Sequence, residues 1–109
     1  MTNERYPKQD AMFPSLLEDQ YQRFADLRED WLLNFGYNTA RAYWADLEDI
    51  LIWSHERQLN PLALREPELR RYRALLKRRG YSSSTIRRRM TAYRGLISAV
   101  DGGDMGTGQ

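Results

Sequence analysis

The stretch Gly80-Tyr81-Ser82-Ser83-Ser84-Thr85-Ile86-Arg87-Arg88-Arg89-Met90 contains the start of one long helix, and the rest of the chain is best read outward from it. Serine hydroxyls ahead of a helix accept hydrogen bonds from its free N–H groups, so we place the helix start near Ser84. Glycine at position 80 is typical of a residue that ends a preceding helix. Apolar residues then recur every three or four positions, which predicts a helix to about residue 100: Ile86, Met90, Tyr93, Ile97 and Val100.

The same spacing of apolar residues predicts three earlier helices, over about 15–35, 38–59 and 67–79. Gly36 ends the first, Asn60 and Pro61 end the second, and Pro67 suits the first turn of the third. No segment alternates strictly between apolar and polar residues, so no strand is expected. The sequence predicts one all-α domain, a compact bundle over 15–100. A flexible tail is expected over 1–14, and a glycine-rich tail or linker stub over 101–109.

Composition excludes several classes of function. The 109 residues contain no cysteine and one histidine, His55, which excludes disulfides, structural zinc sites and thiol nucleophiles. No apolar run approaches the roughly 20 residues that a membrane span needs. Asp46 and Asp49 share a helical face, which we interpret as a solvated acidic face rather than a metal site. We therefore expect no catalytic residue, no metal or other cofactor, no small-molecule substrate and no membrane partner.

The charge is distributed unevenly along the chain. Residues 1–64 hold 6 Lys or Arg and 11 Asp or Glu, a net charge of −5, whereas residues 65–109 hold 11 and 4, a net charge of +7. Such asymmetry indicates a basic surface that meets a polyanion. The alternative is that the two halves neutralise each other in the folded protein.

The arginines at 87, 88 and 89 follow directly after the expected helix start. A helix N-terminus carries partial positive charge and disfavours cations, so an anion is expected to compensate. Free N–H groups, hydroxyls and guanidinium groups together suit a phosphate, and Arg88 or Arg89 could also contact base edges. On this interpretation, replacing Arg88 or Arg89 by alanine leaves the free domain as stable as before. The alternative pairs these arginines with acids of the first two helices.

Further cations and small residues extend this hypothesis. Thr39 and Arg41 repeat the pattern of a polar cap and an arginine at the start of the second helix, and Lys77 belongs to the basic face of the third. On the last helix, Arg94 flanks a face of small residues that includes Gly95. Such a face can approach a nucleic acid closely, or it can pack against another helix; the sequence leaves both open.

The chain resembles the N-terminal core-binding domain of tyrosine recombinases, also called the SAM-like domain of phage integrases. The resemblance is carried by a polar cap followed by Tyr43 in the second helix, and by the Gly80-x-Ser82-x-x-Thr85-Ile86 turn before the last helix. It covers about residues 16–100. It implies an orthogonal, SAM-like bundle of four or five helices that clamps duplex DNA.

The resemblance also implies a role. Mapped by position, and joined to the residues chosen from helix-end electrostatics, it predicts these DNA-binding residues: Thr39, Arg41, Lys77, Ser82, Ser84, Thr85, Arg87, Arg88, Arg89 and Arg94. DNA cleavage in the family belongs to a separate C-terminal domain, so the chain is expected to be non-enzymatic and to serve site-specific recombination and integration. Expected partners are double-stranded DNA and other recombinase protomers, in the cytoplasm of a bacterial or phage-infected cell. The alternative function is a helical protein–protein interaction module.

Overall fold

The computed structural model describes the backbone of residues 7–108 and the side chains of residues 17–101. It contains four α-helices, α1 (Pro7–Leu32), α2 (Tyr37–Arg57), α3 (Glu66–Arg78) and α4 (Ser83–Gly108), and a 3-10 helix over Pro61–Ala63. No strand occurs within the described backbone. The prediction of an all-α bundle is therefore confirmed.

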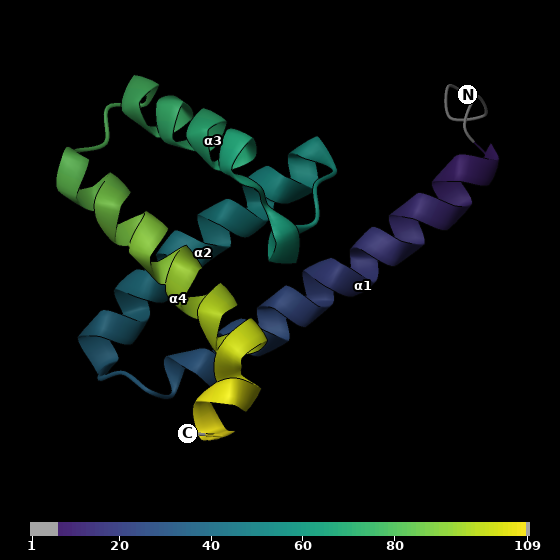
Figure 1. Ribbon diagram of the computed structural model, residues 1–109. Coiled ribbons are helices and arrows are strands. Elements are labelled where there is room, and N and C mark those ends of the chain that lie inside the picture. The colour runs from purple at the N-terminus through teal and green to yellow at the C-terminus, as the bar shows by residue number, and fades with distance from the viewer. Residues whose placement is uncertain (1–6, 109) are drawn as a thin grey trace.

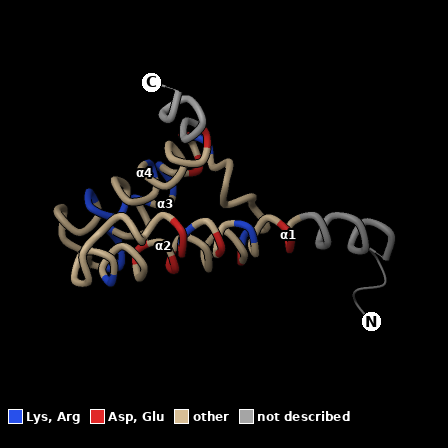
Figure 2. Tube along the Cα trace, turned by 90° about the horizontal axis from the view of Figure 1, so that it is seen from below, with Lys and Arg blue, Asp and Glu red and all other residues tan. Residues whose placement is uncertain are grey.

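The helices cross rather than lie in one layer. Figure 1 shows α1 and α2 running in opposite directions, with α4 crossing α2 steeply and α3 joined to α4 by a short turn. Figure 1 also shows that α2 begins near the C-terminal half of α4, whereas α4 begins at the end of the bundle where α3 ends. We call this the basic end, because Figure 2 shows Lys and Arg gathered there, whereas Asp and Glu follow α1 and α2.

Several helix boundaries differ from the predicted ones. α1 begins at Pro7 and α4 runs to Gly108, so helical backbone extends into both predicted tails, while residues 1–6 and 109 lie outside the described residues. Proline suits the first position of a helix because its fixed φ is already helical. The flexibility of the two ends stays a prediction. α2 begins at Tyr37, one residue before the predicted start, because the carbonyl of extended Gly36 accepts the first helical hydrogen bond, from Ala40 N–H at 2.8 Å.

The core lies where α2, α3 and α4 meet α1. Its fully buried side chains come from all four helices: Phe24, Leu47, Ile50, Tyr72, Leu76 and Leu96. Tyr93 ties α4 to the 3-10 segment, since its hydroxyl donates to the Pro61 carbonyl at 2.7 Å and accepts from Leu64 N–H at 3.2 Å. Trp44 lies beside the apolar stripe of α2 but is not a core residue. It is 39% exposed, and its ring stacks against Arg28.

Part of the small-residue face of α4 packs inside the molecule. Ala92 is fully buried, and a Cβ placed on Gly95 would lie 2.7 Å from Cζ2 of Trp31 in α1. A side chain at 95 would collide with this indole, so glycine permits the close approach of the two helices. Gly95 therefore serves packing against the chain's own α1, whereas Thr91, Ser98 and Ala99 of the same face stay exposed, and the use of that part stays a prediction.

The turn between α3 and α4 sets the position of the basic end. Gly80 has a positive φ of 89°, which glycine adopts without steric cost. The N–H groups of Gly80 and Tyr81 donate to the carbonyls of Lys77 and Leu76, the pattern that closes a helix C-terminus. The next helix follows at once, because Ser82 Oγ accepts from Thr85 N–H at 3.1 Å as its N-cap.

Candidate nucleic-acid interface

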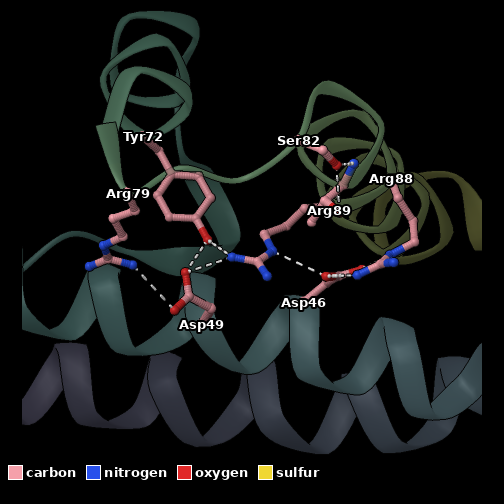
Figure 3. Close-up of polar contacts among 8 residues, drawn as sticks. Asp46, Asp49, Tyr72, Arg79, Ser82, Arg88 and Arg89 are labelled. Carbon is pink, nitrogen blue, oxygen red and sulfur yellow. Dashed lines mark hydrogen bonds and ion pairs between the residues drawn. The ribbon is translucent and has the colours of Figure 1, made fainter. Parts of the chain in front are cut away.

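A buried carboxylate at the crossing of α2 and α4 holds two of the three consecutive arginines. Asp46 has no exposed surface, and its oxygens accept hydrogen bonds from Arg88 Nε at 2.7 Å and Arg88 Nη2 at 2.8 Å. Arg89 Nε donates to the same carboxylate at 3.1 Å. Figure 3 shows the two guanidinium groups converging on Asp46 from α4.

The second part of this network joins α3 to the same crossing. Arg89 Nη1 donates to Asp49 at 3.1 Å and to the Tyr72 hydroxyl at 3.3 Å, and Tyr72 in turn donates to Asp49. Arg79 Nη1 lies 3.6 Å from Asp49 on its other side (Figure 3). The ring of Tyr81 covers the guanidinium of Arg89, with 4.9 Å between Cζ and the ring centroid. We call these residues, with Asp46 and Arg88, the buried ion network.

Titration behaviour follows from these contacts. Burial opposes the charge on Arg89, but the hydrogen bond and charge of Tyr72, and then the contacts with Asp46 and Asp49, outweigh burial and raise its pKa. Burial, and then the hydrogen bond to Asp49, raise the pKa of Tyr72. Arg88 also has a raised pKa, chiefly because of its hydrogen bond to Asp46. Arg88 and Arg89 therefore stay protonated, and the Tyr72 hydroxyl stays neutral, across the neutral pH range.

This arrangement corrects two predictions. The Arg89 side chain is 7% exposed with its polar contacts turned inward, so it has the position of a core residue rather than of a base-reading one. Asp46 and Asp49 form no solvated acidic face, because arginines of α3 and α4 cover them. Removing one partner of a buried ion pair leaves the other uncompensated, so the expectation that the free domain tolerates Arg89→Ala is reversed. The alternative, pairing with acids of the second helix, describes Arg88 and Arg89 better.

Sequence reasoning missed Asp46, Asp49 and Tyr72 as the partners of these arginines. A signal was present, since acids three residues apart on one helix match adjacent arginines on another. The register that brings them together is a property of the helix crossing.

The other cations of the basic end remain at the surface. Lys77, Arg87 and Arg94 are exposed, and none of the ion pairs among the described residues includes them. With Arg73, they line a groove of about 300 Å³ between α3 and α4, whose floor includes the buried side chains of Ile86 and Met90. Arg73 is paired with Glu66 at 2.9 Å. The groove therefore concentrates positive charge with little acidic compensation, which suits phosphate groups.

The predicted hydroxyl groups lie beside this groove but have unequal freedom. Ser84 is exposed on the first turn of α4, whereas Thr85 is half-buried. Ser82 is exposed, yet its Oγ serves as the N-cap and donates to Thr85 Oγ1 at 3.0 Å. The Ser84 hydroxyl also lies 3.3 Å from Ser82 Oγ, so the first turn of α4 keeps its capped geometry with an exposed cluster of hydroxyls in front of the arginines.

Thr39 and Arg41 lie within the first five residues of α2, which Figure 1 places apart from the α3–α4 turn. Both are exposed, and Arg41 lies over the ring of Tyr37 with 5.7 Å to its centroid. Thr39 is not the helix cap, since Gly36 takes that place. Its hydroxyl is therefore not needed for capping.

Other kinds of site find no support within the described part of the chain. No group of three or more metal-ligating side chains converges there. None of the helices searched is long and apolar enough to cross a bilayer. His55 is exposed and lies 3.5 Å from Glu18, as a surface histidine would.

The comparison with known families gives one match, which spans α2, α3 and most of α4. The family model described as the phage integrase N-terminal SAM-like domain matches residues 34–100, from the start of α2 to the end of the described side chains of α4. No curated protein and no solved structure gives a significant match. The family match covers more than half of the 109 residues and confirms the resemblance seen in the sequence. The chain therefore belongs to the family of phage integrase N-terminal SAM-like domains.

Proposed function

We propose that this chain binds duplex DNA through its basic end, as the core-binding module of a tyrosine recombinase. The family supplies the recombinase context. One observation carries the DNA proposal: Lys77, Arg87 and Arg94 are exposed around one groove without an acidic partner among the described residues, while three neighbouring arginines are bound to acids. Unpaired cations on one surface are the electrostatic footprint of a phosphate-binding protein.

The proposed DNA contacts and the residues that support them lie in different parts of the fold. Lys77, Arg87 and Arg94 supply phosphate contacts along the α3–α4 groove, and Ser84 supplies a hydrogen bond beside the α4 N-terminus. Thr39 and Arg41 are proposed as a separate pair of DNA contacts at the start of α2, apart from this groove. Ser82 and Thr85 hold the cap geometry, and Arg89 holds the helix crossing beneath the surface. We therefore remove Arg89 from the set of residues that touch DNA.

The test measures duplex affinity as a function of salt. Replacing Lys77, Arg87 and Arg94 together by glutamine is expected to lower the slope of log K against log salt by about three, near 0.9 for each lost phosphate contact. The matched control replaces Arg23 in α1, Arg57 at the end of α2 and Arg65 just before α3, which are exposed, and removes the same charge. Equal losses in the two variants would show that binding follows net charge alone and would overturn this interface.

The chain itself is proposed to be non-catalytic. The family match is to the N-terminal SAM-like domain of phage integrases, and cleavage is expected from a separate domain. Incubation with a nicked suicide duplex should therefore yield no covalent protein–DNA adduct. A trapped adduct on a tyrosine of this chain would contradict the proposal.

The alternative function, a helical interaction module, keeps only part of the surface on which it was based, because α1 packs against Gly95. A different surface supports contact with further protomers on DNA. Leu33 and Tyr37, between α1 and α2, are 82% and 74% exposed and line a shallow groove with Trp44. Sedimentation of the chain with and without a duplex tests this contact, and a Tyr37→Ser variant should weaken any assembly that forms.

A further inference from the structure

Arg88 combines a fixed orientation with a free hydrogen-bonding edge. A guanidinium group has two edges that can each form a pair of parallel hydrogen bonds. Asp46 occupies the Nε–Nη2 edge, at 2.7 and 2.8 Å. The other edge, formed by Nη1 and Nη2, donates no hydrogen bond to any described residue, and the side chain stays 44% exposed. In Arg89, by contrast, Nε and Nη1 are both engaged and the side chain is 7% exposed.

The support beneath Arg88 does not depend on Arg88 itself. Asp46 is fully buried and also accepts from Arg89 Nε, which Asp49 and Tyr72 hold in turn. The carboxylate is therefore a rigid platform that orients Arg88 in the free protein. A long side chain that is already ordered loses less conformational entropy when it binds a ligand than a mobile one does.

The positive charge of Arg88 is compensated by an acid, unlike that of its neighbours on the surface. Arg87 and Arg94 present uncompensated positive charge, which suits phosphate. Arg88 shares the negative charge of Asp46, so its free edge is better suited to a pair of neutral acceptors than to a phosphate anion. Two acceptors at this spacing, O6 and N7, occur on the major-groove edge of guanine, which pairs bidentately with arginine.

We propose that Arg88 recognises one guanine of the DNA site through its Nη1–Nη2 edge, and that Asp46 is the positioning residue that fixes this edge. The inference rests on the proposed DNA binding and adds to it a base and a sequence-determining pair. It assigns sequence preference to Arg88, whereas Lys77, Arg87 and Arg94 contribute affinity without preference.

The experiment begins by selecting preferred duplexes from a randomised pool with the wild-type chain. Each guanine of the selected duplex is then replaced by 7-deazaguanine, which lacks the N7 acceptor. Loss of the whole bidentate contact corresponds to about 5- to 150-fold. At one guanine the replacement should weaken wild-type binding by less than this, because O6 remains as an acceptor. Arg88→Ala should bind the unmodified duplex at least as weakly as wild type binds the modified one, with no further loss at that guanine.

Two variants distinguish a guanine contact of Arg88 from a contact that depends on its charge alone. Arg88→Lys keeps the charge but lacks the two-nitrogen edge, so it should show the same loss of guanine preference as Arg88→Ala. Arg87→Ala is the matched control: it should keep the guanine preference while the salt slope falls by about one. Arg88→Ala should leave the salt slope nearly unchanged. Thermal melting verifies that both Arg88 variants are folded, which the remaining Asp46–Arg89 pair favours.

The outcomes are distinct. If Arg88→Ala retains the guanine preference, or loses one unit of salt slope without losing that preference, Arg88 is a phosphate contact and the inference is overturned. If the selected pool shows no sequence preference although duplexes bind, the inference fails and the proposed DNA binding stands. If the wild-type chain binds no duplex at low salt, the proposed function fails, and this inference fails with it.

Discussion

The two faces of α4 carry similar side chains in opposite environments, one buried and one exposed. On its inner face Arg89 is buried against Asp46 and Asp49, and Gly95 lies against Trp31. On its outer face exposed residues follow the spacing of helix turns, three or four positions apart: Ser84, Arg87, Thr91, Arg94 and Ser98. Arg87 and Arg89 are two positions apart, yet Arg87 is an exposed cation and Arg89 is a buried structural partner of two acids. The identity of a residue does not decide its role; the direction in which its side chain leaves the helix does.

The largest expected effect is on the inner face. Arg89→Ala should destabilise the free domain by about 3–5 kcal/mol, because it leaves two buried or half-buried carboxylates without their shared cation. Urea or thermal denaturation measures the loss. Arg87→Ala is the natural comparison, since it removes the same charge from the outer face. If the two variants unfold at the same denaturant concentration, the difference between the faces is not energetic.

Packing on the inner face supplies the second test. Gly95→Ala should destabilise the domain by about 1–3 kcal/mol, the usual range for overpacking, because the new methyl group meets the Trp31 indole at 2.7 Å. Alanine favours a helix by up to about 1 kcal/mol over glycine, so a neutral result would mean that α1 moves freely away. Ser98→Ala on the outer face is the control, and its melting temperature should not fall.

The outer face is expected to affect binding and not folding. Arg87→Ala should change the free energy of unfolding by no more than about 0.5 kcal/mol, as surface substitutions usually do. Its log K against log salt slope for a duplex should fall by about one. A clear loss of stability in this variant, measured by melting without DNA, would assign Arg87 a structural partner and weaken the contrast between the faces.

The smallest expected effect concerns the one acid that compensates the groove. Glu66→Gln frees Arg73 and should strengthen duplex binding several-fold at low salt and less at high salt, since an exposed charge is screened. The hydrogen bond from Arg73, and then nearby arginines, lower the pKa of Glu66 below its ordinary value. Its contribution to stability is therefore present above the ordinary carboxyl pKa and is lost as pH falls through the lowered one. Acid titration of melting temperature in wild type and Glu66→Gln measures this contribution, and parallel curves would show that the pair is not stabilising.

Much of the architecture could be predicted from the sequence because it depends on local order. Apolar spacing places the helices, and Gly80 and Ser82 place the turn between α3 and α4, since both act on their own backbone. The predicted helix boundaries were less accurate. Helical backbone at Pro7 and Gly108 lies beyond the predicted boundaries, and Gly36 caps α2 without the side-chain signal that Asn38 and Thr39 offered.

The sequence by itself determined four amphipathic helices, a surplus of cations in the second half of the chain and the turn motif of the family. Only the tertiary structure decided which of those cations are available to a partner. Asp46 and Asp49 lie about 40 residues from the arginines they hold, so their pairing depends on how α2 and α4 cross. Helical periodicity sorts side chains by angle, but it does not say which angle faces another helix and which faces solvent. That is why Arg87 and Arg89, alike in sequence context, acquire different roles in the folded chain.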